Sequence, residues 1–326
     1  MKSKILEILK ARDGYVSGQE LSEYFQVSRT AVWKAVARLK EEGYQIESVQ
    51  KKGYRLVASP DVVLAEEIQS ILKTRWAARE ICYLKTVDST NRYAKKKAEE
   101  GAPHGALVVA EEQTQGKGRM GRNWSDPAGQ NIAMTLILRP AIQPQSASMV
   151  TLVAGLSVAR ALKTLCGLDV KIKWPNDVVA GGRKLCGILS EMSAEMSGIH
   201  YLVIGIGINV NTEHFPEELR DKATSLYLET GEKMQRARII AACMEYFEED
   251  FSLFEKTMDL SLLKDQYEAL LINKDEKVKV LERDASYVGI AKGIDWEGEL
   301  LVEKEDGSLT RVYAGEVSVR GVYGYT

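Results

Sequence analysis

The pattern of apolar residues changes at Ser59-Pro60-Asp61, and this break constrains how the chain can fold more than any other feature. Three short helical patterns and two brief strand patterns precede it. Strand and helix patterns alternate after it to about residue 271, and short strands follow. A chain of 326 residues also exceeds the usual length of a single hydrophobic core. We therefore expect three domains, over residues 1–60, 61–272 and 273–326.

The first sixty residues have the pattern of a winged helix-turn-helix. Apolar residues at helical spacing predict a first helix. Ser17 and Glu20 match the S-x-x-E capping box that opens a second helix, and Ser28 can cap a third. Strand patterns at 44–49 and 53–57 follow, joined by a basic tip. We expect a helix-turn-helix with a two-stranded wing.

The third helix and the wing tip carry the residues that we expect to contact DNA, namely Arg29, Thr30, Lys34, Lys51 and Lys52. Recognition helices touch base edges and phosphates near their N-terminal ends. Residues 1–60 contain 11 Lys and Arg against 7 Asp and Glu, which favours a polyanionic partner. The alternative is a solvated charged face on a protein-interaction domain.

Specific DNA binding by such a small domain implies a dimer. Few phosphate contacts give weak, salt-sensitive binding, so useful specificity requires two domains on paired half-sites. Trp33 lies in the third helix, and we expect it to belong to the core because large aromatic side chains are usually buried.

The central region begins with a strand at 81–87, the turn DSTN (88–91) and a polar helix. Hydroxyl groups at the start of this helix would be placed to hold an anion or a urea-like group. The alternative is that Ser89 or Thr90 is only an N-cap. Local pattern alone favours the cap.

Residues 113–124, QTQGKGRMGRNW, form a glycine-rich segment that literally contains G-x-G-x-x-G. A dinucleotide-binding loop requires a helix directly after the glycines, and WSDPAG (124–129) precludes one. No G-x-x-x-x-G-K-[ST] motif occurs in the sequence. What remains is a flexible loop whose cations Lys117, Arg119 and Arg122 can hold phosphates.

Three further segments complete the central region. A strand runs into KWPND (173–177), a second strand contains RKLCGIL (183–189), and a third contains GIGINVN (205–211). Taken singly, each has a simple structural explanation: a turn cap for Asp177, a solvated face for Lys184 and packing relief for the glycines. The combination is harder to explain in this way.

In this order, DSTN, GKGRMGRNW, KWPND, RKLCGIL and GIGINVN resemble the motifs of the biotin protein ligase family. The resemblance spans nearly the whole chain, and with the N-terminal domain it extends to the bifunctional ligases that also repress biotin operons in bacteria. It implies a multidomain α/β (α+β) fold. This fold has an N-terminal winged helix-turn-helix, a central α/β ligase domain with a mixed sheet, and a small C-terminal SH3-like β-barrel.

The resemblance also implies site residues. Biotin would contact Ser89, Thr90, Asn91, Gln113, Lys117, Gly118, Arg119 and Lys184. ATP or the adenylate would contact Arg119, Arg122, Asn176, Asn209 and Arg236. Arg119, Arg122 and Lys184 would be catalytic. The family's GRGR is GKGR here, so a point charge at Lys117 replaces a planar guanidinium. Metal ligands and an adenine-stacking residue are not identified.

The implied activity is that of a biotin–[acetyl-CoA-carboxylase] ligase. Biotin and ATP, with Mg²⁺, would give biotinyl-5′-AMP and pyrophosphate, without a protein nucleophile. The biotin would then pass to a lysine of a biotin carboxyl carrier protein. The adenylate would also act as corepressor by ordering loops that favour a homodimer on operator DNA. The alternatives are a ligand-sensing repressor without catalysis and a lipoate-type ligase.

The remaining features narrow the class of protein. Short strand patterns at 277–281, 287–294, 299–303 and 310–313 predict the small C-terminal barrel. Charges interrupt the start of the chain and no run of about 18 apolar residues occurs, so we expect a cytoplasmic protein that does not bind membranes. Four scattered cysteines and three histidines show no zinc-ligand spacing.

Overall fold

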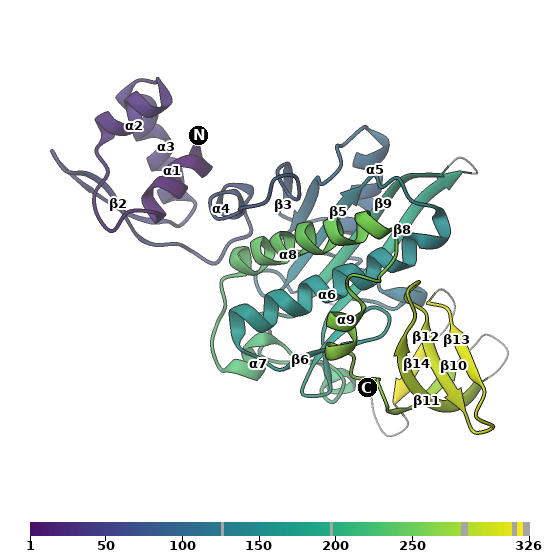
Figure 1. Cartoon of the computed structure of the whole chain (residues 1–326). Helices are drawn as coiled ribbons and strands as arrows, with labels where there is room; N and C mark the ends of the chain where they lie inside the picture. The colour runs from purple at the N-terminus through teal and green to yellow at the C-terminus, as the bar shows by residue number, and fades with distance from the viewer. Residues whose placement is uncertain (125–126, 196–197, 282–285, 315–317, 322–326) are drawn as a thin grey trace. The chain divides into compact units, whose positions relative to one another are not determined.

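The computed structural model describes residues 1–124, 127–195, 198–281, 286–314 and 318–321 (Figure 1). Its contacts define two compact units. The first contains Met1–Lys73 with Gln235–Ala241, and the second contains Thr74–Met234 with Ala242–Thr326.

The first unit begins with the predicted winged helix-turn-helix. Its elements are α1 (Lys2–Lys10), α2 (Gly18–Phe25), α3 (Arg29–Glu41), β1 (Gln45–Val49), β2 (Gly53–Ala58) and α4 (Ala65–Gln69). The Ser17 hydroxyl accepts a hydrogen bond from Glu20 N at 3.0 Å, and Ser28 caps α3 in the same way. The antiparallel pair β1–β2 forms the wing. These caps confirm the predicted starts of α2 and α3.

Trp33 lies outside the core of this unit, which corrects the expectation that it is buried. Its side chain is 59% exposed. Val32, Val36 and Leu39 already fill the inward face of α3. The helical period then leaves Trp33 on the solvent side.

The second unit is built on the predicted mixed sheet, which has seven strands in the described structure. Its strands are β3 (Ile81–Leu84), β4 (Leu107–Ala110), β5 (Ile132–Leu138), β6 (Val170–Lys173), β7 (Asp177–Ala180), β8 (Arg183–Glu195) and β9 (Gly198–Ile208). Their order is β3-β4-β5-β9-β8-β7-β6. β3 and β4 are parallel, and the other neighbours are antiparallel.

Helices cover this sheet. They are α5 (Thr90–Glu99), α6 (Ala147–Cys166), α7 (Leu226–Thr230), α8 (Arg236–Thr257) and α9 (Lys264–Leu270). Figure 1 shows α6 and α8 running side by side along the sheet. The Asp250 carboxylate of α8 joins them, because Ser157 donates a hydrogen bond to it at 2.8 Å and Arg160 forms an ion pair with it.

The segment Pro144–Cys166 is long and apolar enough to cross a membrane by length and composition alone. However, 72% of its most apolar window is buried inside the protein. Its residues Val150, Leu156 and Ala161 are almost fully buried. This burial is what a core helix of a folded domain shows.

The two central strands leave a gap in the side chains on one face of the sheet. Gly187 of β8 pairs with Gly207 of β9, and Gly205 lies two residues away. Because side chains alternate along a strand, these three glycines share one face. Ile188 points to the opposite face, where its Cδ1 would lie 3.8 Å from a Cβ built on Gly155 of α6. α5 packs on this same face farther along β9, so the glycines leave a local gap in its side chains.

The C-terminal domain is a small antiparallel sheet of five described strands. They are β10 (Lys277–Leu281), β11 (Ser286–Ile294), β12 (Leu300–Lys304), β13 (Leu309–Val312) and β14 (Ser318–Gly321), in the order β13-β12-β11-β10-β14. The first four correspond to predicted strands, within one or two residues. β14 was not predicted. It contains four residues, too few for a clear alternating pattern.

The β11–β12 turn joins this domain to the central sheet. The buried Trp174 follows β6 and donates its Nε1 hydrogen to Gly298 O at 3.0 Å. Leu260 N donates to Trp296 O at 2.8 Å. The tryptophan of KWPND is thus a structural link between the two domains.

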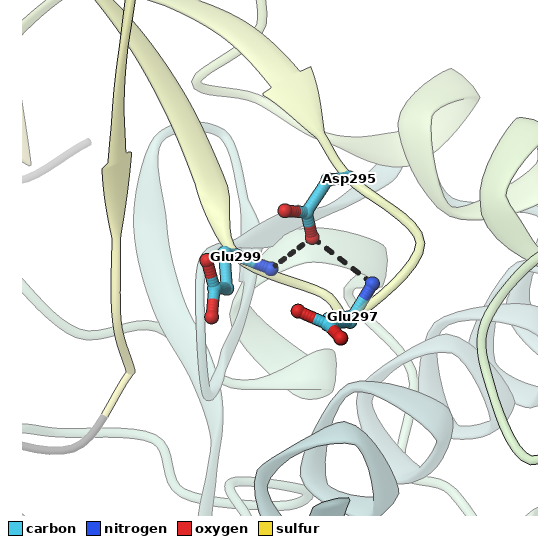
Figure 2. A group of neighbouring side chains, drawn as sticks. All are labelled: Asp295, Glu297 and Glu299. Atoms are coloured by element: carbon cyan, nitrogen blue, oxygen red, sulfur yellow. Dashed lines mark hydrogen bonds between the residues drawn. The ribbon is translucent and has the colours of Figure 1, made fainter.

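Three carboxylates gather in the same turn (Figure 2): Asp295, Glu297 and Glu299. Asp295 Oδ1 accepts hydrogen bonds from the backbone nitrogens of Glu297 and Glu299 at 3.0 and 2.9 Å, which shapes the turn. Arg311 Nε lies 3.5 Å from Asp295 Oδ2. Glu299 is 9% exposed, and burial together with the charges of Asp295 and Glu297 raises its pKa.

We expect Glu299→Gln to stabilise the protein at neutral pH. A raised pKa in the folded state means that Glu299 favours folding below its ordinary pKa of 4.5 and loses this contribution as the pH rises through the folded value. The amide keeps the shape and removes the charge. The melting temperature of the variant, followed by circular dichroism, should exceed that of the wild type at about pH 7, with the difference closing toward about pH 4.

Asp306→Asn is the matched control. Hydrogen bonds from Ser308 lower the pKa of this exposed acid, so its substitution should give no stabilisation at neutral pH. A difference between Glu299→Gln and wild type that does not change with pH would contradict the proposed cause.

Candidate functional site

A pocket lies on the glycine face of the central sheet. It is lined by Ser89, Thr90, Asn91, Gln113, Lys117, Gly118, Arg119, Trp124, Asn176, Lys184, Gly187, Ile188, Leu189, Gly205, Ile206 and Gly207. Every residue predicted to contact biotin is in this set. The structure therefore brings together residues from separate motifs, and their individual roles stay predictions.

The glycines make room for two side chains of the pocket. A Cβ built on Gly205 would lie 2.1 Å from Asn91 Oδ1, and one built on Gly207 would lie 2.5 Å from the Trp124 ring. No side chain fits at such distances without displacing its neighbour. Asn91 and Trp124 thus occupy the space that the strands leave free.

The start of α5 presents a hydroxyl group that is not used for capping. Ser89 stands at the N-cap position of α5, but its side chain makes no cap hydrogen bond in the described structure. Instead, Gln113 Oε1 accepts hydrogen bonds from Thr90 N at 2.8 Å and Thr90 Oγ1 at 2.9 Å. Gln113 therefore serves as the cap, and the Ser89 hydroxyl remains available beside the pocket.

Asn91 is held by a network within the protein. Its Nδ2 donates to Leu189 O at 3.1 Å and to Glu191 Oε2 at 2.8 Å. Its Oδ1 accepts from Thr135 Oγ1 at 2.7 Å. With both ends of the amide engaged, Asn91 fixes α5 against β8. Its predicted contact with biotin is not tested by this geometry.

The glycine-rich segment folds back on itself as a compact loop. Gly118 N donates to Arg122 O at 2.7 Å, and Trp124 N donates to Gly116 O at 2.9 Å. Lys117 Nζ lies 3.2 Å from Asn123 Oδ1. The loop contains the short 3₁₀ turn Arg119–Gly121 in place of the helix that a dinucleotide fingerprint requires.

Arg119 connects this loop to two other parts of the second unit. Its guanidinium donates to Asn176 Oδ1 at 3.0 Å and to Ala314 O of the C-terminal domain at 2.6 Å. Burial lowers the pKa of Arg119, but an arginine stays charged near neutral pH. The site is thus partly closed by the C-terminal domain.

Lys184 is paired with a carboxylate that lies just outside the pocket lining. Its Nζ lies 2.6 Å from Asp177 Oδ1 and 5.7 Å from the centroid of the Trp124 ring. Asn176 Nδ2 donates to Ile188 O at 3.1 Å, which holds the KWPND turn against β8. Among the described residues, the pocket lining contains cations and no acidic side chain. Such a pocket suits an anionic ligand.

A second hollow adjoins the first. It is lined by Arg119, Met120, Ser148, Thr151, Pro175, Asn176, Ile188, Leu189, Ser190 and Ala314. Arg119 and Asn176 line both hollows. Two ligands, or two parts of one ligand, would meet at these side chains.

Three residues predicted to contact ATP lie outside the described linings of both hollows. Arg122 is exposed on the loop. Asn209 is 5% exposed, and its Nδ2 donates to Thr224 O at 3.0 Å. Arg236 is 1% exposed in the first unit, where Asp61 accepts hydrogen bonds from its backbone and guanidinium. Their roles toward ATP stay predictions.

Trp124 is a pocket residue that the sequence reasoning missed. Its Nε1 is buried, with no hydrogen-bond partner among the described residues. A buried donor is usually satisfied, so this one points to a ligand or water. The signal in the sequence was an aromatic residue directly after a polar, glycine-rich loop, where no core position is expected.

The predicted DNA contacts lie on the first unit. Arg29, Thr30 and Lys34 are exposed on α3, and Lys51 and Lys52 are exposed at the wing tip. Lys52 also lies 5.8 Å from the centroid of the Tyr15 ring. The structure thus places all five on the surface of one small domain.

Three family models match the chain. The HTH domain matches residues 2–55, the Biotin/lipoate A/B protein ligase family matches residues 83–209, and the Biotin protein ligase C terminal domain matches residues 275–320.

Similar proteins cover nearly the whole chain. The Bifunctional ligase/repressor BirA of Bacillus spizizenii is 37% identical over 322 residues, which are 98% of each chain. The protein of the same name from Escherichia coli is 31% identical over 97% of this chain and 96% of its own. A solved structure, the biotin protein ligase from Aquifex aeolicus in complex with biotin and ATP, has a TM-score of 0.66 at 31% identity. It covers 74% of this chain and 99% of that one.

We expect Gly207→Ala to destabilise the protein by about 1–3 kcal/mol, because the new methyl group would collide with Trp124. In a Trp124→Ala background the same substitution should cost less than about 0.5 kcal/mol. Urea unfolding of the four proteins measures the coupling. Gly155→Ala, whose Cβ would make ordinary contacts, is the control. Equal costs in both backgrounds would show that Trp124 does not fill this space.

Proposed function

The chain belongs to the family of bifunctional biotin protein ligases and repressors, and from this premise we propose how its residues perform both tasks. It is an ATP-dependent biotin protein ligase with a DNA-binding repressor domain. The observation that carries the residue-level proposal is the pocket on the glycine face, where all the predicted biotin residues converge.

Biotin lies in this pocket with its two polar ends held differently. The free Ser89 hydroxyl and the start of α5 hold the urea-like ring. Lys184 and Arg119 hold the carboxylate. The Trp124 ring covers the apolar part between them, and its buried Nε1 gains a partner from the ligand.

Activation is a displacement at phosphorus. A biotin carboxylate oxygen attacks the α-phosphorus of ATP, the bond to the β,γ-diphosphate breaks, and biotinyl-5′-AMP and pyrophosphate form. The charge on the phosphoryl oxygens is stabilised by Arg119, Lys184 and the exposed loop residue Arg122. The remaining rate enhancement comes from holding the two substrates in the reactive orientation. Arg119 and Asn176 line both hollows, so the two substrates meet beside them.

Transfer follows from the chemistry of the mixed anhydride. The amine nitrogen of a carrier-protein lysine attacks the biotinyl carbonyl carbon, the bond to AMP breaks, and an amide forms with loss of a proton. The carrier is the biotin carboxyl carrier protein of acetyl-CoA carboxylase or of another biotin-dependent carboxylase. AMP leaves as a stable anion, so no covalent enzyme intermediate is needed.

Mg²⁺ fits this site as a companion of ATP. Mg²⁺ is usually held by one or two carboxylates together with substrate phosphates. The described pocket lining itself contains no acidic side chain. The adjacent KWPND turn offers two oxygen ligands for the ion, the Asn176 amide oxygen and the Asp177 carboxylate. Asn176 and Asp177 would hold the ion, which would neutralise phosphate charge when bound.

Repression uses the adenylate as corepressor in a homodimer. Lys184 is tied to the 212–225 segment, because its N donates to Lys222 O at 2.8 Å and its O accepts from Thr224 N at 2.9 Å. A ligand that shifts the main chain of β8 at Lys184 therefore also shifts this segment. Ordering of this segment and of the glycine-rich loop favours a dimer that presents two winged helices to an operator.

The proposal also covers the domain boundaries of the chain and its location in the cell. The functional domains are residues 1–60, 61–272 and 273–326, and each matching family model falls within one of them. The protein works in the cytoplasm, where ATP, carrier protein and DNA are all present.

We expect Lys184→Met to lower biotin-dependent pyrophosphate release by about 10²–10³-fold, the usual cost of losing one charge-stabilising donor. The assay contains ATP, Mg²⁺ and either biotin or lipoate, and a biotin-carrier domain is added afterwards to detect labelling. Lys171→Met, which removes a lysine of β6 paired with Asp169, is the control and should keep full activity. Thermal unfolding checks that both variants are folded.

The wild-type protein decides between reaction classes in the same assay. Biotin-dependent release followed by carrier labelling supports the ligase. Release with lipoate in place of biotin would indicate a lipoate-type ligase, and no release with either acid would leave a ligand-sensing repressor.

We expect biotin and ATP together to shift the protein from monomer to dimer in sedimentation and to increase its affinity for operator DNA selected from random duplexes. The logarithm of DNA affinity falls linearly with the logarithm of salt concentration. Lys34→Ala and Lys51→Ala should each reduce the magnitude of this slope by about one for every phosphate that the variant no longer neutralises. Lys233→Ala, in the second unit, is the control. Equal operator affinity with and without the adenylate would rule out the corepressor role.

A further inference from the structure

Trp33 is the largest exposed apolar side chain of the helix that we expect to enter DNA. It is 59% exposed, whereas most other apolar residues of α3 are buried or half-buried. No aromatic ring or cation packs against the Trp33 ring among the residues that the structure describes. The core does not use this side chain, so Trp33 is available for a contact outside the domain.

The position of Trp33 on α3 matches that of a base-contacting residue. Ser28 caps the helix through Ala31 N at 3.2 Å, which places Trp33 in the second turn. Arg29 lies one turn before it on the same side, at the spacing that brings side chains together. Residues in the first turns of a recognition helix are those that reach base edges.

The charges of α3 and of the wing tip favour DNA as the partner of Trp33. Arg29, Lys34, Arg38 and Lys51 form no ion pair with any residue of the described chain. By contrast, Arg55 is paired with Glu47 at 2.8 Å, and its guanidinium lies 5.2 Å from the Tyr15 ring. An exposed ring on the same small domain as these cations fits a polyanion that also offers an apolar feature. The thymine methyl group is that feature in the major groove.

We propose that Trp33 contacts a thymine methyl group in each operator half-site and thereby contributes to sequence specificity. Arg29 and Lys34 hold neighbouring phosphates or base edges, so Trp33 distinguishes thymine while the cations supply affinity. The inference deepens the proposed repressor function and depends on it.

The test removes the methyl group from the DNA and the ring from the protein. A duplex is selected from a random pool with the full-length protein, biotin and ATP. Each thymine is then replaced in turn by deoxyuridine, which lacks only the methyl group, and affinities are measured by fluorescence anisotropy. For the wild type, deoxyuridine at one position of each half-site should weaken binding about fourfold, the value of one buried methyl group at about 0.8 kcal/mol.

Trp33→Ala should bind the thymine duplex more weakly and lose this sensitivity, so that deoxyuridine at the same position costs less than about 1.5-fold. Tyr24→Ala is the matched control, because Tyr24 is 58% exposed on α2 of the same domain. It should keep the full effect of deoxyuridine. Circular dichroism confirms that both variants fold.

Two outcomes would overturn the inference. In the first, the wild type and Trp33→Ala lose the same affinity at every deoxyuridine position, or neither loses any affinity. The protein then binds DNA, but Trp33 does not contact a thymine methyl group. If the wild type selects no duplex with biotin and ATP present, the repressor function itself fails and the inference fails with it.

Discussion

The absence of side chains at the Gly187–Gly207 pair is the constraint on which the site depends. α6 packs against one face of the central sheet and α5 against the other, and the pocket forms on the α5 face because β8 and β9 present glycines there. Trp124 and Asn91 use this space from different sequence regions, at distances that no Cβ would permit. Lys184 then stands beside Trp124 with its charge directed by Asp177. The cationic pocket is thus a consequence of strand register.

The C-terminal domain contributes to the site through hydrogen bonds to main-chain oxygens. Trp174 donates to Gly298 O, and Arg119 donates to Ala314 O. Both donors belong to sequence motifs of the central domain, whereas the acceptors carry no side-chain signature. Sequence divergence in the C-terminal domain can therefore leave these hydrogen bonds intact.

The sequence predicted what depends on local pattern. Helix caps at Ser17 and Ser28, the alternating elements of the central domain and the motif residues around the pocket all followed from spacing or resemblance. Contacts between distant residues did not. The burial of Arg236 against Asp61 joins positions far apart in the chain, and the exposure of Trp33 depends on how completely its neighbours fill the core. Trp124 was missed because its environment comes from two strands that follow it much later.

The ion pair between Lys184 and Asp177 has a consequence for selectivity. A ligand anion must compete with a carboxylate that already holds the lysine at 2.6 Å and is largely shielded from water. A simple anion such as phosphate offers one new charge interaction in exchange for the one that it breaks, and it gains little. In the binding mode that we propose, biotin makes contacts along the whole pocket and so displaces the internal competitor. In that binding mode, the Asp177 carboxylate would act as a built-in competitor that disfavours small cellular anions.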